Sequence, residues 1–274
     1  MKSRILKLFE LLSNIKWDII FLKKKLFQKE FREAMKSNKK FKNIHLGKRC
    51  FIVGNGPSLN KLDLNKISNE IVFTVNNIMA NSSIYNTLNS DFHVLIDPDY
   101  LRLNPELHPE DNDAINRLKQ INYKDKKPVC IVRDDAKNAF SKYGIEKILN
   151  IHYIFQHRNM TDKYSSEISM SKNMPSPQNV IQAAIFSAIY MGFKKIYLIG
   201  VDMTSVFMTY EADDDGKTVI LKDSHAYSFS EKEINTMLNR FRYDNEFMMK
   251  DYAIVFSIYK KIKKYAEKNN IEVY

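Results

Sequence analysis

The chain has 274 residues, which is enough for one substantial core, and neither its length nor its composition demands two domains. Its formal charge of +11 is unevenly distributed: residues 1–50 hold 15 Lys and Arg against 4 Asp and Glu, whereas residues 51–274 hold 28 of each. Because the body is electroneutral and has no basic stripe to follow a duplex, we expect no nucleic-acid partner.

An amphipathic helix is predicted near the amino terminus. Its apolar residues recur at alternating spacings of three and four, and they are Ile5, Leu8, Leu12, Ile15, Ile19, Leu22 and Leu26. The apolar runs are too short to span a bilayer, and the lysines have no place in a signal peptide. Trp17 and neighbouring lysines favour an anionic membrane surface as the partner of residues 1–40. A helix packed on its own domain and a coiled-coil homo-oligomer stay open as alternatives.

The predicted division of the chain follows this helix. Residues 1–45 form a basic helical extension, in which the lysine-rich residues 37–43 are predicted to be a solvated linker, and residues 46–274 form the main domain. Cys50 and Cys130 each begin an apolar run, so both are predicted core thiols of a reducing compartment. We therefore expect a cytoplasmic protein on the inner face of the cytoplasmic membrane.

Strands and helices alternate from residue 48 onward, which predicts an α/β fold with a Rossmann-like, doubly wound and mostly parallel sheet. The predicted strands are Cys50–Val53, Ile71–Val75, Phe92–Ile96, Val129–Val132, Ile151–Ile154, Ile196–Val201 and Ile271–Tyr274. The clearest predicted helix runs from Asn179 to Met191, and a later one runs from Asn245 to Lys268. Residues 203–244 are poor in periodicity, which suggests a lid-like excursion over a ligand site.

Polar residues follow four of the predicted strands. The first strand ends in Gly54, Asn55, Gly56, Pro57 and Ser58; the next ends are Asn76 with Asn77, Asp97, and Gly200 with Asp202. Ligands of open α/β sheets bind at the carboxyl ends of the strands. Asparagine and serine are neutral donors and acceptors, suited to sugars, ribose hydroxyls and base edges. The dinucleotide glycine fingerprint and the lysine of a phosphate-loop NTPase are both missing from these loops.

These motifs carry a resemblance to known families. The run Gly54-Asn55-Gly56-Pro57-Ser58-Leu59, the segment from Met191 to Asp202, and the Ser224-His225 pair resemble the bacterial lipooligosaccharide sialyltransferases of glycosyltransferase family 42. The resemblance covers roughly residues 48–274. The related hydroxymethylpterin diphosphokinase-like proteins share the first loop and the Gly-Val-Asp strand end.

The resemblance implies roles for particular residues. By position, nucleotide binding falls to Asn55, Gly56, Pro57, Ser58, Asn76 and Asp97, and the strand-end pattern itself adds Gly54, Asn77, Gly200 and Asp202. The family's Thr-Ser-Gly at the start of the long helix has no residue-by-residue match here. Ser176, Gln178 or Asn179 could cap that helix and bond the nucleotide or sugar. Tyr210 matches the second of two family tyrosines that bond the departing phosphate, and Thr204 replaces the first. The family's histidine base falls on Phe229, so His225 is the candidate base.

The resemblance thus implies an inverting, metal-independent glycosyltransferase without a cofactor. Its donor would be a CMP-activated sialic-acid-like or related acidic keto-sugar, and its acceptor a cell-surface glycan or glycolipid. One alternative is a pterin or nucleotide diphosphokinase, which would need Mg²⁺ and acidic ligands such as Asp97, Asp99 and Asp202. Another is a non-catalytic sugar-nucleotide-binding module. Asp213–Asp215 is most simply interpreted as a solvated turn.

Overall fold

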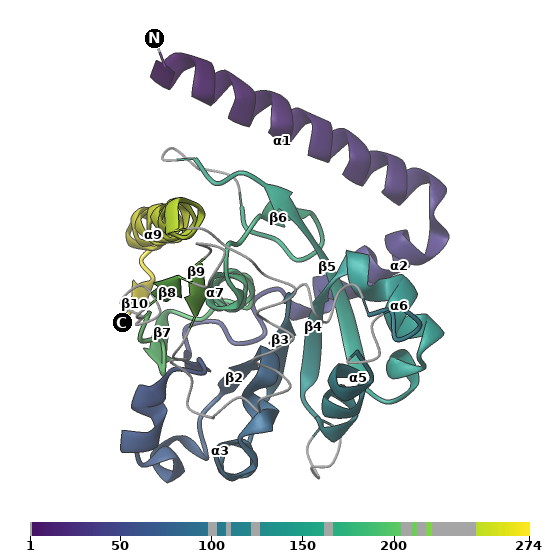
Figure 1. Cartoon of the computed structure of the whole chain (residues 1–274). Coiled ribbons are helices and arrows are strands. Elements are labelled where there is room, and N and C mark those ends of the chain that lie inside the picture. The colour runs from purple at the N-terminus through teal and green to yellow at the C-terminus, as the bar shows by residue number, and fades with distance from the viewer. Residues whose placement is uncertain are drawn as a thin grey trace.

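The computed structural model describes residues 2–97, 103–107, 111–121, 127–161, 167–203, 210–212, 218–220 and 245–274. Eight parallel strands form one sheet in the order β10-β7-β1-β2-β3-β4-β5-β6 (Figure 1). The strands are β1 (Arg49–Val53), β2 (Val72–Val75), β3 (Phe92–Leu95), β4 (Val129–Arg133), β5 (Asn150–Arg158), β6 (Asn173–Pro175), β7 (Lys195–Ile199) and β10 (Glu272–Val273). The predicted α/β class and parallel sheet are confirmed.

Helices cover both faces of the sheet, which makes it doubly wound. The helices of the body are α3 (Ser82–Thr87), α5 (Asp111–Gln120), α6 (Lys137–Lys142), α7 (Val180–Tyr190) and α9 (Asn245–Lys268). α7 and α9 pack on one face, and α3, α5 and α6 pack on the other. The strands are continuous apolar runs because side chains on both of their faces are buried. Both predicted helices, at 179–191 and 245–268, are present as α7 and α9.

The strand order reverses between β1 and β7. From β1 the chain adds β2 to β6 in one direction, and it then returns to place β7 and β10 on the other side of β1. In open parallel sheets such a reversal is the place where ligands bind, beyond the carboxyl ends of the two strands. The four polar strand ends found in the sequence belong to β7, β1, β2 and β3, which are neighbours in the sheet.

The amino-terminal extension consists of α1 (Lys2–Phe27), α2 (Lys29–Ser37) and the 3-10 turn η1 (Asn38–Phe41). Figure 1 shows α1 as a long helix beside α2 and β6. The prediction that residues 37–43 form a solvated linker is wrong. Asn38 is fully buried, and its amide donates to the carbonyl oxygens of Tyr153 and Met170 at 2.7 and 3.0 Å, while Phe41 enters the core. The lysines of this segment are exposed, and their number in the sequence suggested a solvated linker although Asn38 and Phe41 are buried.

Three short strands were not predicted. β6 is an edge strand that ends in Pro175, beyond an irregularity in its pairing with β5, and edge positions are where a sheet accepts proline. The other two, β8 (Tyr210–Ala212) and β9 (Thr218–Ile220), form an antiparallel pair within the predicted excursion. The remainder of residues 204–244 lies outside the described residues. No helix of the described chain is both long and apolar enough to cross a membrane.

Candidate functional site

The loop after β1 lies against the chain segment that follows β7. The backbone amide of Gly54 donates to the carbonyl of Ile199, and that of Gly56 donates to Gly200, both at 2.8 Å. These bonds continue the β1–β7 pairing one step past the end of the strands. The loop is therefore fixed at the switch point of the sheet.

Two glycines permit this close approach. A β-carbon on Gly56 would lie 2.4 Å from Oδ2 of Asp202 and 2.7 Å from the carbonyl oxygen of Gly200. Gly200 has φ +64°, and a β-carbon there would lie 2.5 Å from the side chain of Leu59. All three distances are well inside van der Waals contact, so only glycine fits at either position. Leu59, the last residue of the first-loop motif, packs over Gly200.

Asp202 fastens the far end of the loop. Its Oδ2 accepts a hydrogen bond from the backbone amide of Ser58 at 2.8 Å. This interaction spans 144 residues of sequence and joins the β1 and β7 loops directly. Hydrogen bonds to a charged acceptor contribute about 1.5–3 kcal/mol. The carboxylate predicted to bind a nucleotide thus has one oxygen engaged in shaping the loop.

Three asparagines at the ends of β1 and β2 have buried amide oxygens. Within the described part of the chain, Oδ1 of Asn55, Asn76 and Asn77 finds no hydrogen-bond partner. Asn76 has φ +39°, an uncommon conformation for a non-glycine residue, and its amide nitrogen lies 3.5 Å from Asp97 at the end of β3. An unpaired buried acceptor costs about 1–3 kcal/mol, so each of these oxygens needs a donor, which an ordered water or a ligand can supply. Sugar hydroxyls and base amino groups are donors of that kind.

The amino end of α7 lies at the same edge of the sheet and is held by its neighbours. Asn179 caps the helix by accepting from the Gln182 amide at 3.1 Å, as predicted, and its side chain also contacts the hydroxyl of Tyr259. Gln178 donates to Asp251 of α9 at 2.5 Å. The Ser176 backbone amide bonds to Arg158 at 2.7 Å. These contacts give the three predicted ligand-binding residues a structural role at the α7–α9 junction.

The structure describes no side chain for the three residues assigned to the chemical step, Thr204, Tyr210 and His225. Thr204 and His225 lie outside the described residues, as do Asp99, Phe229 and Asp213–Asp215. Tyr210 begins β8, and only its backbone is described.

The other histidines of the sheet have structural surroundings. His93 is fully buried beside Thr74, 2.8 Å from its hydroxyl, and burial lowers the pKa of His93 to about 3. His152 lies edge-on to Phe41, and burial lowers its pKa to about 4. Both rings are therefore neutral at physiological pH.

The rim carboxylates Asp97 and Asp202 both contact the loops between them. Asp97 follows β3 and Asp202 follows β7, and β2 and β1 lie between them. Asp202 accepts from the Ser58 amide in the β1 loop at 2.8 Å, and Asp97 lies 3.5 Å from the side-chain nitrogen of Asn76 at the end of β2. Among the described residues, no group of three or more His, Cys, Asp or Glu is arranged to hold a metal.

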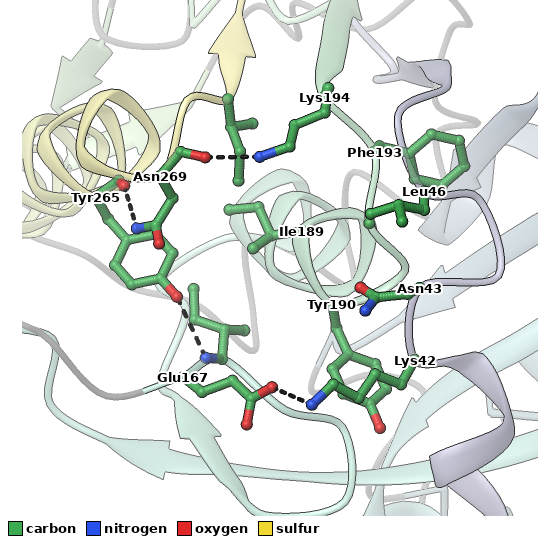
Figure 2. Close-up of a pocket in the computed structure, with 13 residues that line it drawn as sticks. Lys42, Asn43, Leu46, Glu167, Ile189, Tyr190, Phe193, Lys194, Tyr265 and Asn269 are labelled. Carbon is green, nitrogen blue, oxygen red and sulfur yellow. Dashed lines mark hydrogen bonds and ion pairs between the residues drawn. The ribbon is translucent and has the colours of Figure 1, made fainter.

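A separate pocket lies at the opposite edge of the sheet, near the end of α7 (Figure 2). Its volume is about 160 Å³, below the roughly 300–1,000 Å³ typical of ligand pockets. Figure 2 shows its polar groups engaged with one another: Lys42 pairs with Glu167 at 2.6 Å, and Lys194 donates to the Asn269 carbonyl at 2.7 Å. We assign this pocket to the packing of α7, α9 and the turn before β1.

Comparisons with known proteins come from a family model and from solved structures. The family model described as 6-hydroxymethylpterin diphosphokinase MptE-like matches residues 25–206, a range that includes all four polar strand ends. The sialyltransferase CstII from Campylobacter jejuni, solved with cytidine-5'-monophosphate, is 18% identical over 84% of this chain and 79% of that one, with a TM-score of 0.37. The sialyltransferase CST-II, solved with CMP and a trisaccharide acceptor, is also 18% identical. That match covers 83% of this chain and 80% of that one, with a TM-score of 0.38. No curated protein matches the chain.

Proposed function

Because the chain belongs to the 6-hydroxymethylpterin diphosphokinase MptE-like family, and its polar loops meet at the switch point of a parallel sheet, we propose that it is a nucleotide-dependent transferase. The nucleotide would lie over the carboxyl ends of β7, β1, β2 and β3. The finer proposal is an inverting glycosyltransferase. It would transfer a sialic-acid-like or related acidic keto-sugar from CMP to a cell-surface glycan such as lipooligosaccharide, lipopolysaccharide or capsule.

The observation that carries this proposal is the group of buried amide acceptors at the site. Asn55, Asn76 and Asn77 offer buried amide oxygens without partners in the described chain. These oxygens would receive the amino group of a base or the hydroxyls of a ribose. The opening loop and the Gly200–Asp202 strand end add the sequence resemblance to glycosyltransferase family 42.

The proposed chemistry uses residues of the predicted excursion. Loss of the nucleotide leaves an oxocarbenium-like centre on the sugar, and hydroxyls of Thr204 and Tyr210 would stabilise the departing phosphate. His225 would accept the proton of the acceptor hydroxyl, since an imidazole with its ordinary pKa is a competent base at neutral pH. The acceptor would be reached at the inner face of the cytoplasmic membrane, where residues 1–40 would hold the enzyme.

A diphosphokinase is the second candidate, and the family's own description favours it. That reaction transfers a diphosphate from a nucleoside triphosphate and would require Mg²⁺. In the described chain Asp202 is bonded to the backbone amide of Ser58, and Asp97 lies beside the side chain of Asn76. The glycosyltransferase proposal needs no such ion.

Calorimetric titration of the full chain separates the two candidates. We expect CMP to bind equally well with and without EDTA, and ATP with Mg²⁺ to bind weakly or not at all. Asn55→Ala should weaken CMP binding about tenfold, because one hydrogen bond is lost. Asn65→Ala, on the exposed turn η3 (Leu64–Ile67), is the matched control and should bind as the natural chain does. Binding of ATP only, dependent on Mg²⁺, would favour the diphosphokinase.

A further inference from the structure

Helix α1 turns a polar face toward the body. Asn14 accepts from the backbone amide of Asn159 at 2.7 Å and donates to its carbonyl at 3.3 Å. One turn from the end of α1, Lys24 pairs at 2.5 Å with Asp134, whose side chain is 5% exposed. Asp134 directly follows β4 and Asn159 directly follows β5. The helix is therefore attached to the carboxyl edge of the sheet at two separate points.

Aromatic rings fill the space between these two points. The indole of Trp17 stacks on His157, with ring centroids 4.0 Å apart and planes 13° from parallel. Phe21 is 7% exposed and packs on Phe155 and on Phe31 of α2. These contacts recur every three or four residues along one side of α1, so that side is fully used by the body.

The opposite side of α1 is apolar and faces away from the body. Six side chains share it, and they are Leu8, Leu12, Ile15, Ile19, Leu22 and Leu26. We call them the α1 stripe. Their exposed fractions lie between 47% and 68%. At 100° per residue, the stripe is centred opposite the side that holds Asn14, Trp17 and Phe21. An exposed apolar patch of this length marks an interaction surface.

Lysines border the α1 stripe on both sides. Helical spacing places Lys16 and Lys23 along one border and Lys25 along the other, and all three are exposed. Of the two acidic residues near the stripe, Glu10 falls on the side of Asn14 and Phe21. Asp18 falls on the Lys25 border, where it pairs with Arg158 at 3.5 Å. The borders of the stripe thus carry three lysines against one carboxylate, which is paired with Arg158, and they are net positive.

This charge pattern decides between two occupants. A second copy of the chain would bring its own lysines to the same borders, where like charges repel. An anionic bilayer supplies the opposite charge and an apolar interior for the stripe, and each lysine near such a surface contributes about 1 kcal/mol. The pattern thus complements a membrane and opposes self-association.

We propose that the α1 stripe, with its lysine borders, is a docking surface for an anionic phospholipid bilayer, presented in a fixed orientation by the contacts of α1 with β4 and β5. This refines the membrane association proposed above and is independent of the group that the enzyme transfers. Docking requires no unfolding or release of α1, because the stripe is already exposed.

Vesicle flotation of the full chain tests the proposal. The natural chain should float with phosphatidylcholine vesicles that contain phosphatidylglycerol, and float poorly with phosphatidylcholine alone. Ile15→Glu combined with Ile19→Glu should abolish flotation, since it places two charges in the stripe. Lys16→Ala combined with Lys23→Ala should weaken binding to the anionic vesicles about 30-fold.

Leu107→Glu is the matched control, because Leu107 is 73% exposed and lies outside the extension, between β3 and α5. It should float like the natural chain. Equal thermal midpoints would show that all variants are folded. The proposal is overturned if the Ile15→Glu, Ile19→Glu variant still floats. A second result would also overturn it: the natural chain does not bind vesicles, light scattering shows that it is a dimer, and the Ile15→Glu, Ile19→Glu variant is a monomer. Calorimetric titration of the same samples with CMP measures nucleotide binding, so a failure of the proposed function can be distinguished from a failure of membrane docking.

Discussion

At Gly56 the space that a side chain would need is already occupied. The carboxylate of Asp202 and the carbonyl of Gly200 lie where a β-carbon would be placed, and both are themselves held by hydrogen bonds. A methyl group must therefore displace the β1 loop from the β7 loop. Asn55 and Ser58 flank Gly56 and would move with it.

We accordingly predict that Gly56→Ala removes nucleotide binding while the sheet stays folded. The measurement is calorimetric titration with CMP, together with thermal unfolding. Gly144→Ala is a matched control: Gly144 has φ +70° but no atom within 4 Å of the added carbon. It should lower stability by about 1–2 kcal/mol through backbone strain and leave binding unchanged. Normal CMP affinity in Gly56→Ala would show that the loop does not contact the nucleotide.

Individual residues at the site differ in how far their sequence predicted them. Asn55 and Asn76 follow apolar strands, and parallel strand ends share one edge, so their placement was predictable. The contact of Ser58 with Asp202 was not, because nothing in the chain order says that β7 pairs with β1. The roles of Thr204, Tyr210 and His225 stay predictions.

Among the secondary-structure elements, too, the positions were predictable from the sequence and the long-range contacts were not. All seven predicted strands are present, because buried parallel strands are continuous apolar runs. The amino-terminal helix was predicted from its apolar seam, yet the body packs on its other side. Periodicity identifies an apolar face, but the pairing of Lys24 with Asp134 and of Asn14 with Asn159 depends on groups far away in the sequence.

The attachment of α1 yields a prediction about Asp134. Burial would raise the pKa of its carboxyl, but the neighbouring His157 and Lys24 outweigh burial and hold that pKa below its ordinary value. The contact is therefore present above the ordinary carboxyl pKa and is lost as the pH falls through the lowered one. Asp134→Ala should loosen α1 at neutral pH by roughly 1–3 kcal/mol.

Hydrogen exchange of the α1 amides is the appropriate measurement. Exchange around residues 14–24 should become roughly 5- to 150-fold faster in Asp134→Ala, while the strands of the sheet keep their protection. Glu30→Ala breaks the exposed pair with Lys137 and serves as the control, because surface ion pairs contribute little. Unchanged exchange in Asp134→Ala would mean that the aromatic contacts alone hold the helix.

On the scale of the whole molecule, the sheet buries two neutral imidazoles. His93 lies in β3 and His152 in β5, and burial lowers their pKa values to about 3 and about 4. In the unfolded chain both rings would titrate near the ordinary histidine value of about 6.5. Below that pH the two imidazoles bind protons in the unfolded state but not in the folded state. Stability is therefore complete above about pH 6.5 and declines as the pH falls.

The decline can be measured by urea denaturation at pH 7 and pH 5. At pH 5 each buried imidazole should lower the free energy of unfolding by about 2 kcal/mol. This follows because pH 5 lies about 1.5 units below the ordinary histidine pKa, and each unit corresponds to about 1.36 kcal/mol. His152→Gln keeps a polar side chain that cannot titrate, so the variant should lose about 2 kcal/mol less between the two pH values than the natural chain. An identical loss in both proteins would mean that His152 is already protonated in the folded state, and that acid acts on other groups.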